Sequence, residues 1–239
     1  MISPLRRQSR SVSLSSIGGK LSHGIAAINA TIEPRAQFWD KWNANTIDNE
    51  GPLWITLGDS VTQGIGSSTP EMSYVSIVLE RLILRTGLPW RVLNLSMSGG
   101  RFDDVTKRQL PALRSSGLRA DLVTSIIGSN DIMWRRDKAA IEKDAKKMLE
   151  VLPNGTFLSK VSRSEKNDRR RLINNAFSKS EEDGKVYLFN AWNWPTGIGM
   201  WAEDRFHPND RAYKLIANNL WTALLENRAF REQWVSRDQ

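Results

Sequence analysis

Short runs of consecutive apolar residues alternate along this chain with longer stretches in which apolar residues recur at helical spacing. Five runs have the length and composition that predict β-strands: residues 53–57, 91–95, 122–127, 156–161 and 186–189. The stretches between them predict helices at about 73–86, 102–116, 137–152 and 167–182, with another after Pro208. Several strands are apolar at consecutive positions, as is typical of strands covered by helices on both faces. The pattern therefore predicts an α/β fold with a mainly parallel sheet.

The 239 residues and the 40% hydrophobic composition suit one such domain, which we place at residues 51–239. Residues 1–50 are less regular. We expect an N-terminal arm with a short docked helix there, because Phe38, Trp39 and Trp42 need an apolar surface to pack against. Near the N-terminus the chain lacks the apolar stretch of a signal peptide, and no window approaches the roughly 18 apolar residues of a membrane-spanning helix. We therefore expect a soluble, cytoplasmic protein.

The composition narrows the possible chemistry. The absence of cysteine excludes disulfides, thiolate metal sites and a cysteine nucleophile. Half of the formal net charge of +8 comes from residues 160–171, which hold six basic and two acidic side chains. Apolar residues share one face of the helix predicted there, so we interpret the basic residues as its solvated face. No nucleic-acid-binding motif accompanies the charge, and we do not expect a nucleic-acid partner.

Ser60 is the first candidate for catalysis. It lies in the segment GDSVTQG, residues 58–64, directly after the first predicted strand. Ligands of parallel α/β sheets bind at the carboxyl ends of the strands, so a serine here would be presented to a substrate. The alternative is an ordinary strand-to-helix turn in which Ser60 caps the helix.

His207 is the better of the two histidines as a base for that serine, since a hydroxyl needs a base to become a good nucleophile. It follows Asp204 by three residues in DRFHP, whereas His23 has no carboxylate close in sequence. Asp204 could fold back onto Nδ1 of His207, and Nε2 would then face Ser60, as in a Ser-His-Asp triad. A helix-entry cap or a metal pair would also fit, but one histidine with scattered carboxylates is not a recognisable metal-ligand set.

Two further turns offer groups that could bind an oxyanion. Asn130, in GSND at residues 128–131, is a neutral donor at the end of a strongly apolar strand. The segment SGG at residues 98–100 offers backbone N–H groups that glycine allows close to a substrate. Each segment alone is also typical of an ordinary turn. Together with the segments around Ser60 and His207, however, they indicate one site at the ends of the strands.

The sequence resembles the GDSL, or SGNH, family of esterases and lipases. Four family blocks appear in order as GDSVTQG, NLSMSGG, GSND and DRFH, and they span most of the chain after residue 50. Val61 stands where the family usually has leucine, and both residues are apolar. The resemblance implies a flavodoxin-like three-layer α/β/α fold with a central five-stranded, mainly parallel sheet.

The resemblance also implies roles for individual residues. These are Ser60 as the nucleophile, His207 with Asp204 as its base and supporting acid, and the Ser60 and Gly99 backbone N–H groups with the Asn130 amide as the oxyanion hole. Alignment with the family block favours Gly99 over the adjacent Gly100.

We therefore expect a serine esterase that hydrolyses short-chain acyl or O-acetyl esters through an acyl-enzyme, without a cofactor or a metal. The substrate could be a small-molecule, lipid or sugar ester, and the oligomeric state is left open. An acyltransferase is a close variant. The alternative from another class is a catalytically silent binding protein of the same fold, which would contact phosphate-bearing partners through the basic residues 160–171.

Aromatic and sulfur-containing side chains near two of the blocks are candidates for substrate binding. Trp134 follows GSND, and Met200 and Trp201 precede DRFH, where apolar loop residues often form a pocket wall. Core packing beneath the last helix is an equal alternative for these three. For Trp192, close to the strand predicted at 186–189, we favour core packing.

Overall fold

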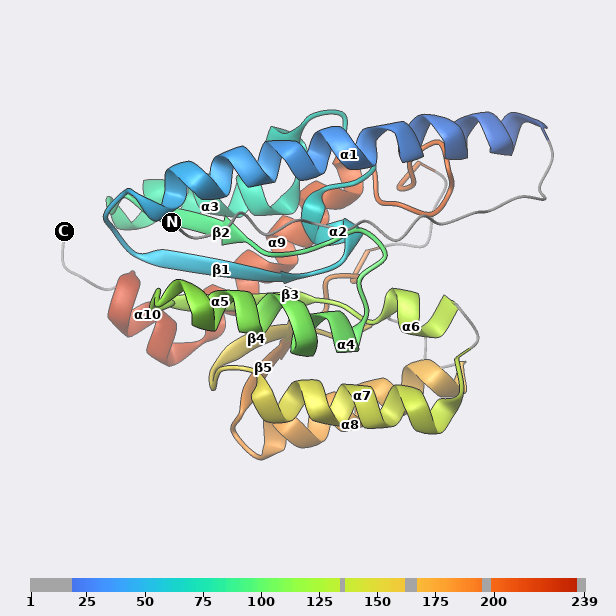
Figure 1. Cartoon of the computed structure of the whole chain (residues 1–239). Coiled ribbons are helices and arrows are strands. Elements are labelled where there is room, and N and C mark those ends of the chain that lie inside the picture. The colour runs from blue at the N-terminus through green and yellow to red at the C-terminus, as the bar shows by residue number, and fades with distance from the viewer. Residues whose placement is uncertain (1–18, 134–135, 162–166, 195–198, 236–239) are drawn as a thin grey trace.

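The structure is a computed structural model that describes residues 19–133, 136–161, 167–194 and 199–235 (Figure 1). Its sheet has the strand order β2-β1-β3-β4-β5, and every adjacent pair of strands is parallel. The strands are β1 (Leu53–Gly58), β2 (Arg91–Asn94), β3 (Leu122–Ile126), β4 (Thr156–Ser159) and β5 (Val186–Phe189). All five lie where the apolar runs predict them, which confirms the expected α/β fold.

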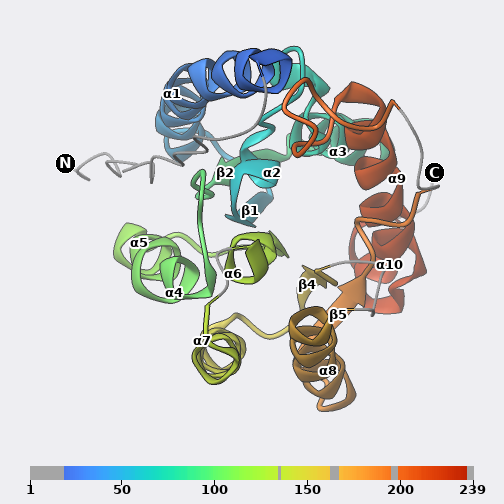
Figure 2. The same ribbon diagram turned by 90° about the vertical axis from the view of Figure 1, so that its right-hand side faces the viewer.

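Helices cover both faces of the sheet and give the three layers seen in Figure 2. The first face carries α3 (Tyr74–Thr86), α9 (Asp210–Glu226) and α10 (Arg228–Trp234), and the second carries α4 (Phe102–Asp104), η2 (Val105–Gln109), α5 (Leu110–Ser116), α7 (Lys138–Val151) and α8 (Asp168–Glu182). Within β1, Trp54 belongs to the core of the first face, whereas Ile55 and Leu57 belong to that of the second. Burial on both sides explains why this strand is mainly apolar at consecutive positions, with Thr56 the one polar residue of Leu53–Leu57.

The helix predicted at 102–116 is interrupted by a π-helical segment, η2, between α4 and α5. Pro111 follows this segment and cannot donate the backbone hydrogen bond that a regular α-helix needs there. The segment turns Gln109 toward the end of β1. The Gln109 amide donates to the Gly58 carbonyl at 2.8 Å and accepts from the Gly58 N–H at 2.9 Å. This two-way contact ties the helix to the residue two positions before Ser60.

The N-terminal segment contains helix α1, Gly19–Ile47, whose 29 residues exceed the short helix that we expected. Asn43 explains part of its docking: its side chain donates to the Asn94 carbonyl at 2.7 Å and accepts from the Asn94 N–H at 2.9 Å. These bonds satisfy backbone groups of the edge strand β2. Trp39 is buried and donates to the Gln63 carbonyl at 2.9 Å, whereas Trp42 remains 39% exposed. Helix α1 therefore covers the β2 edge of the sheet (Figure 1).

No helix within the described ranges combines the length and the apolar character needed to cross a membrane.

Candidate active site

Ser60 begins the short helix α2 (Ser60–Gln63) at the carboxyl end of β1. The preceding Asp59 caps this helix by accepting the Val61 N–H at 2.9 Å. Gly58 makes the sharp turn possible. Its φ is +150°, and a Cβ there would lie 2.4 Å from the Ile126 carbonyl oxygen. The strand end thus presents the Ser60 hydroxyl in a nearly buried position with 5% exposure.

His207 and Asp204 lie next to Ser60, although 147 residues separate the histidine from the serine. Nε2 of His207 is 2.9 Å from Oγ of Ser60, and Nδ1 is 2.5 Å from Oδ2 of Asp204. The other oxygen of Asp204 accepts the backbone N–H groups of Phe206 and His207, each at 3.0 Å. Both carboxylate oxygens are therefore held, and the imidazole ring is fixed between an acid and a hydroxyl.

Close backbone packing positions the loop that carries this pair. Arg205 adopts a left-handed conformation with φ of +55°, which lets the chain fold Asp204 back onto His207. A Cβ at Gly66 would lie 2.8 Å from the His207 Cβ, and one at Gly24 of α1 would lie 2.4 Å from the Glu203 carbonyl oxygen. The N-terminal helix and the loop after α2 therefore both pack against the His207 loop.

The electrostatic environment of Asp204 favours its charged form. Burial disfavours the charge, but the hydrogen bond and the charge interaction with His207, aided by the Phe206 and His207 N–H groups, hold its pKa below the ordinary value. An ionised carboxylate at this position can keep the Nδ1 proton in place. Nε2 is then free to accept the proton of Ser60.

Asn130 and Gly99 follow β3 and β2, respectively, the two strands that flank β1 in the sheet. Asn130 is in α6 (Ser129–Met133) and lines the same cavity as Ser60. Its amide nitrogen donates one hydrogen to the Gly100 carbonyl at 2.9 Å, which leaves the second hydrogen for another acceptor. Gly99 is buried in a turn with φ of +72° and is not one of the residues that line the cavity. Its part in an oxyanion hole therefore stays a prediction.

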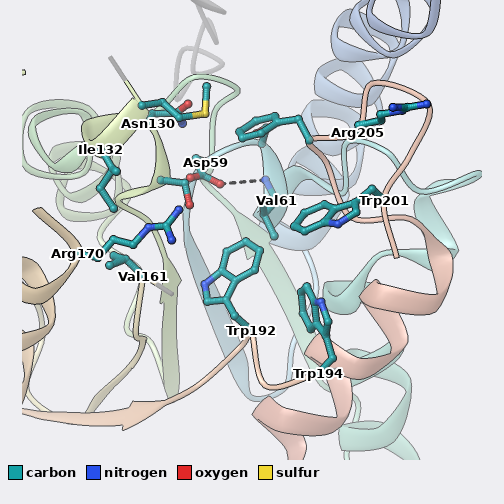
Figure 3. A pocket seen from close by; sticks show the side chains of 14 residues that line it. Asp59, Val61, Asn130, Ile132, Val161, Arg170, Trp192, Trp194, Trp201 and Arg205 are labelled. Atoms are coloured by element: carbon teal, nitrogen blue, oxygen red, sulfur yellow. Dashed lines mark hydrogen bonds between the residues drawn. The ribbon is translucent and has the colours of Figure 1, made fainter. Parts of the chain in front are cut away.

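A cavity of about 370 Å³ opens beside Ser60, and Figure 3 shows its lining. Of the three apolar candidates, Trp201 lines this cavity and is 42% exposed. Met200 does not line it and instead packs, partly buried, against the hydrophobic core. Trp134 lies outside the described residues. Trp192, for which we favoured core packing, touches the core but also lines the cavity beside Trp194.

Two arginines that line the cavity were not predicted from the sequence pattern. Arg170 belongs to the basic segment that we interpreted as a solvated helix face, but it lines the cavity from the first turn of α8. Arg205 lines the cavity from the loop between Asp204 and His207. Helical periodicity had distinguished only an apolar from a polar face, and a residue at their border can point into a neighbouring cavity.

Asp59 is a buried carboxyl group in this cavity, and its protonation affects stability. Burial raises its pKa from 3.8 to about 7, with the Val61 N–H opposing this change and Asp131 adding to it. In the unfolded chain Asp59 ionises near pH 3.8, whereas in the folded protein it keeps its proton until about pH 7. Its ionisation therefore favours the unfolded state increasingly as the pH rises through this window.

We expect the substitution Asp59→Asn to stabilise the protein progressively relative to wild type between pH 4 and pH 8. Asparagine stays neutral, and its Oδ1 can still accept the Val61 N–H. The difference in the free energy of unfolding should grow by at most about 4 kcal/mol over this range, as measured by urea denaturation. The exposed Asp48→Asn is the matched control and should show no such trend. A constant difference across pH for Asp59→Asn would contradict the prediction.

Within the described ranges, His, Asp and Glu side chains form no group of three that could hold a metal ion.

Comparison with known proteins identifies the family. Residues 56–215 match the GDSL-like lipase/acylhydrolase family, and this match spans more than half of the chain. The chain therefore belongs to the GDSL-like lipase/acylhydrolase family, which makes it a carboxylic ester hydrolase. Helix α1 precedes the matched region. A sequence comparison with curated proteins gave no match.

Three solved structures, two of them described as esterases, share the fold. TesA aligns with a TM-score of 0.61 at 20% identity, over 74% of this chain and 99% of TesA. The esterase EstA from Pseudoalteromonas sp. aligns with a TM-score of 0.59 at 17% identity, over 72% and 95% of the respective chains. A variant of Axe2, an acetylxylan esterase from Geobacillus stearothermophilus, aligns with a TM-score of 0.56 at 20% identity. The alignment covers 73% of this chain and 94% of the Axe2 chain. These similarities confirm the three-layer fold.

Proposed function

We propose that this protein is a serine esterase in which Ser60 is the nucleophile, His207 the general base and Asp204 its supporting acid. The observation that carries the proposal is the pair of contacts made by the imidazole. They run from Nε2 to the Ser60 Oγ at 2.9 Å and from Nδ1 to the Asp204 Oδ2 at 2.5 Å. A buried hydroxyl with an oriented base is the arrangement that nucleophilic catalysis requires.

The reaction follows from these contacts. Nε2 of His207 takes the proton of Ser60 as Oγ forms a bond to the ester carbonyl carbon. The resulting oxyanion accepts hydrogen bonds from the free Asn130 amide hydrogen and from the Ser60 and Gly99 backbone N–H groups. Collapse of this intermediate breaks the ester C–O bond, and the leaving alcohol takes the proton from Nε2. Water, deprotonated by the same nitrogen, then releases the acid and restores Ser60.

Covalent labelling with a fluorophosphonate tests this proposal, because such a probe reacts with an activated serine. The expected result is one adduct, found by mass spectrometry on the peptide that contains Ser60. The substitution Ser60→Ala should abolish the adduct. The control Ser68→Ala removes an exposed hydroxyl that binds Asp210 and should leave the labelling intact. Absence of labelling in the folded wild-type protein would refute the mechanism.

The cavity supports a preference for short acyl groups. Its volume of about 370 Å³ lies near the lower end of the range for ligand pockets, and Trp192, Trp194 and Trp201 form part of its wall. Across a series of p-nitrophenyl esters we expect kcat/KM to peak between acetyl and butyryl. It should fall for acyl chains of eight carbons or more, as measured by initial rates at substrate concentrations below micelle formation. A maximum at palmitate would contradict this and would indicate a lipid substrate.

A further inference from the structure

Arg170 places a positive charge in the wall of an otherwise mainly apolar cavity. It lies in the first turn of α8, and Figure 3 shows its guanidinium group directed into the cavity between Val161 and Trp192. The side chains of Ile132 and Trp194 also line this cavity. The charged group is therefore next to hydrocarbon and indole surfaces that reduce its contact with water.

The arginines on either side of Arg170 have protein partners, whereas the described residues offer none to the Arg170 guanidinium group. Nε of Arg169 donates to the Arg136 carbonyl at 3.1 Å, and Arg171 pairs with Asp168 at 2.7 Å. Within the described ranges, the guanidinium group of Arg170 has neither a hydrogen bond nor an ion pair. Five N–H donors are thus left for another acceptor. Arg170 is half-buried, so its donors are only partly solvated, and an anionic ligand could supply acceptors in place of the remaining water.

The charges around the cavity favour a negatively charged ligand. Two of the lining side chains are guanidinium groups, Arg170 and the exposed Arg205. Among the described lining residues the only carboxyl group is that of Asp59, which is buried and accepts the Val61 N–H. Attraction between opposite charges strengthens as water is excluded, so an anion beside Arg170 would be bound more tightly than at an open surface.

We propose that Arg170 determines substrate specificity by binding an anionic group of the ester, for which a carboxylate is the simplest example. The preferred substrate is then an ester with a short apolar part that contacts the aromatic wall and a carboxylate that reaches the guanidinium group. Bidentate pairing with a planar carboxylate suits arginine better than lysine. This inference rests on the proposed function, because it assigns the substrate of the Ser60 site.

Kinetics with matched ester pairs test the inference on both sides of the scissile bond. Monoethyl glutarate and ethyl pentanoate have acyl groups of equal length and differ in the carboxylate. On the alcohol side, 4-acetoxybenzoate and 4-methylphenyl acetate form the equivalent pair. In wild type, kcat/KM should be higher for the anionic member of at least one pair. Arg170→Gln should lower the anionic-to-neutral ratio of kcat/KM by about 10-fold to 100-fold, and Arg170→Lys should lower it less.

Arg171→Gln is the matched control, since it removes the same charge from the next residue of the same helix. Arg171 is exposed and pairs with the exposed Asp168, so the ratio should stay within about twofold of wild type. Thermal unfolding of each variant separates a loss of specificity from a loss of folding. An anionic-to-neutral ratio that Arg170→Gln leaves unchanged in both pairs would overturn the inference.

Measurements of ligand affinity in a protein that cannot turn over the ester test the role of Arg170 separately from the serine mechanism. In the Ser60→Ala background, titration calorimetry with monoethyl glutarate and with 4-acetoxybenzoate measures affinity without turnover. Addition of Arg170→Gln should weaken the binding of the preferred anionic ester at least about 10-fold, and addition of Arg171→Gln should not. Binding that depends on Arg170 in a protein that fails to label at Ser60 would refute the serine mechanism alone. Labelling at Ser60 without such binding would refute the role of Arg170 alone.

Discussion

Replacing Asp204 with asparagine is expected to lower kcat by about 1,000-fold to 10,000-fold with little change in KM. Oδ1 of Asp204 accepts two backbone N–H groups, from Phe206 and His207, while Oδ2 faces Nδ1 of His207. An asparagine would keep its oxygen toward the two N–H groups, which turns its NH₂ group toward Nδ1. The imidazole would then carry its proton on Nε2 and could not accept the proton of Ser60.

Initial rates with p-nitrophenyl acetate over a range of concentrations measure this effect. Asp210→Asn is the matched control, because Asp210 is a nearby carboxylate that contacts Ser68 rather than the imidazole. Its kcat should stay close to wild type. Asp204→Asn should also unfold near the wild-type temperature, since the loop bonds survive, whereas Asp204→Ala should unfold at a lower temperature. A kcat for Asp204→Asn within tenfold of wild type would contradict the assigned role.

The fold was predictable from the sequence because each strand lies between two helix layers. Side chains that point to either face of such a strand are buried, and β1 and β3 are buried at every position. Both strands are therefore mainly apolar on consecutive residues, without the alternation of a half-exposed strand. The segments after these strands carry Ser60 and Asn130, and a parallel sheet brings them to one edge. The approach of His207 to Ser60 was predicted from the spacing of Asp204 and His207 and from the resemblance to the family.

The remaining features depend on contacts that local sequence patterns do not encode. The two-way bonds of Asn43 with Asn94 and of Gln109 with Gly58 each join residues that are 51 positions apart. Nothing in either segment specifies its partner. The direction of Arg170 is a similar case, because periodicity indicates which helix face is polar but not whether a cavity lies beside it. Such contacts are set by the packing of elements that are distant in sequence.

We expect Asn130→Ala to lower kcat by about 100-fold to 1,000-fold while KM changes little. One hydrogen of the Asn130 amide binds the Gly100 carbonyl at 2.9 Å, which fixes the orientation of the amide at the cavity wall. The second hydrogen can then meet the oxyanion, whose charge appears only in the transition state. Removal of this donor therefore affects the chemical step more than the binding of the uncharged ester.

The same substitution also removes the bond to Gly100, so its effect on stability has to be separated from its effect on catalysis. Asn43→Ala is a suitable control, because Asn43 is likewise buried and bonds to a backbone carbonyl, that of Asn94, but lies in α1. Each substitution should lower the free energy of unfolding by about 1–3 kcal/mol, and only Asn130→Ala should lower kcat to the stated extent. An increase in KM at unchanged kcat would instead indicate that Asn130 binds the ground-state substrate. Loss of a donor that binds the oxyanion must slow the chemical step and therefore lower kcat.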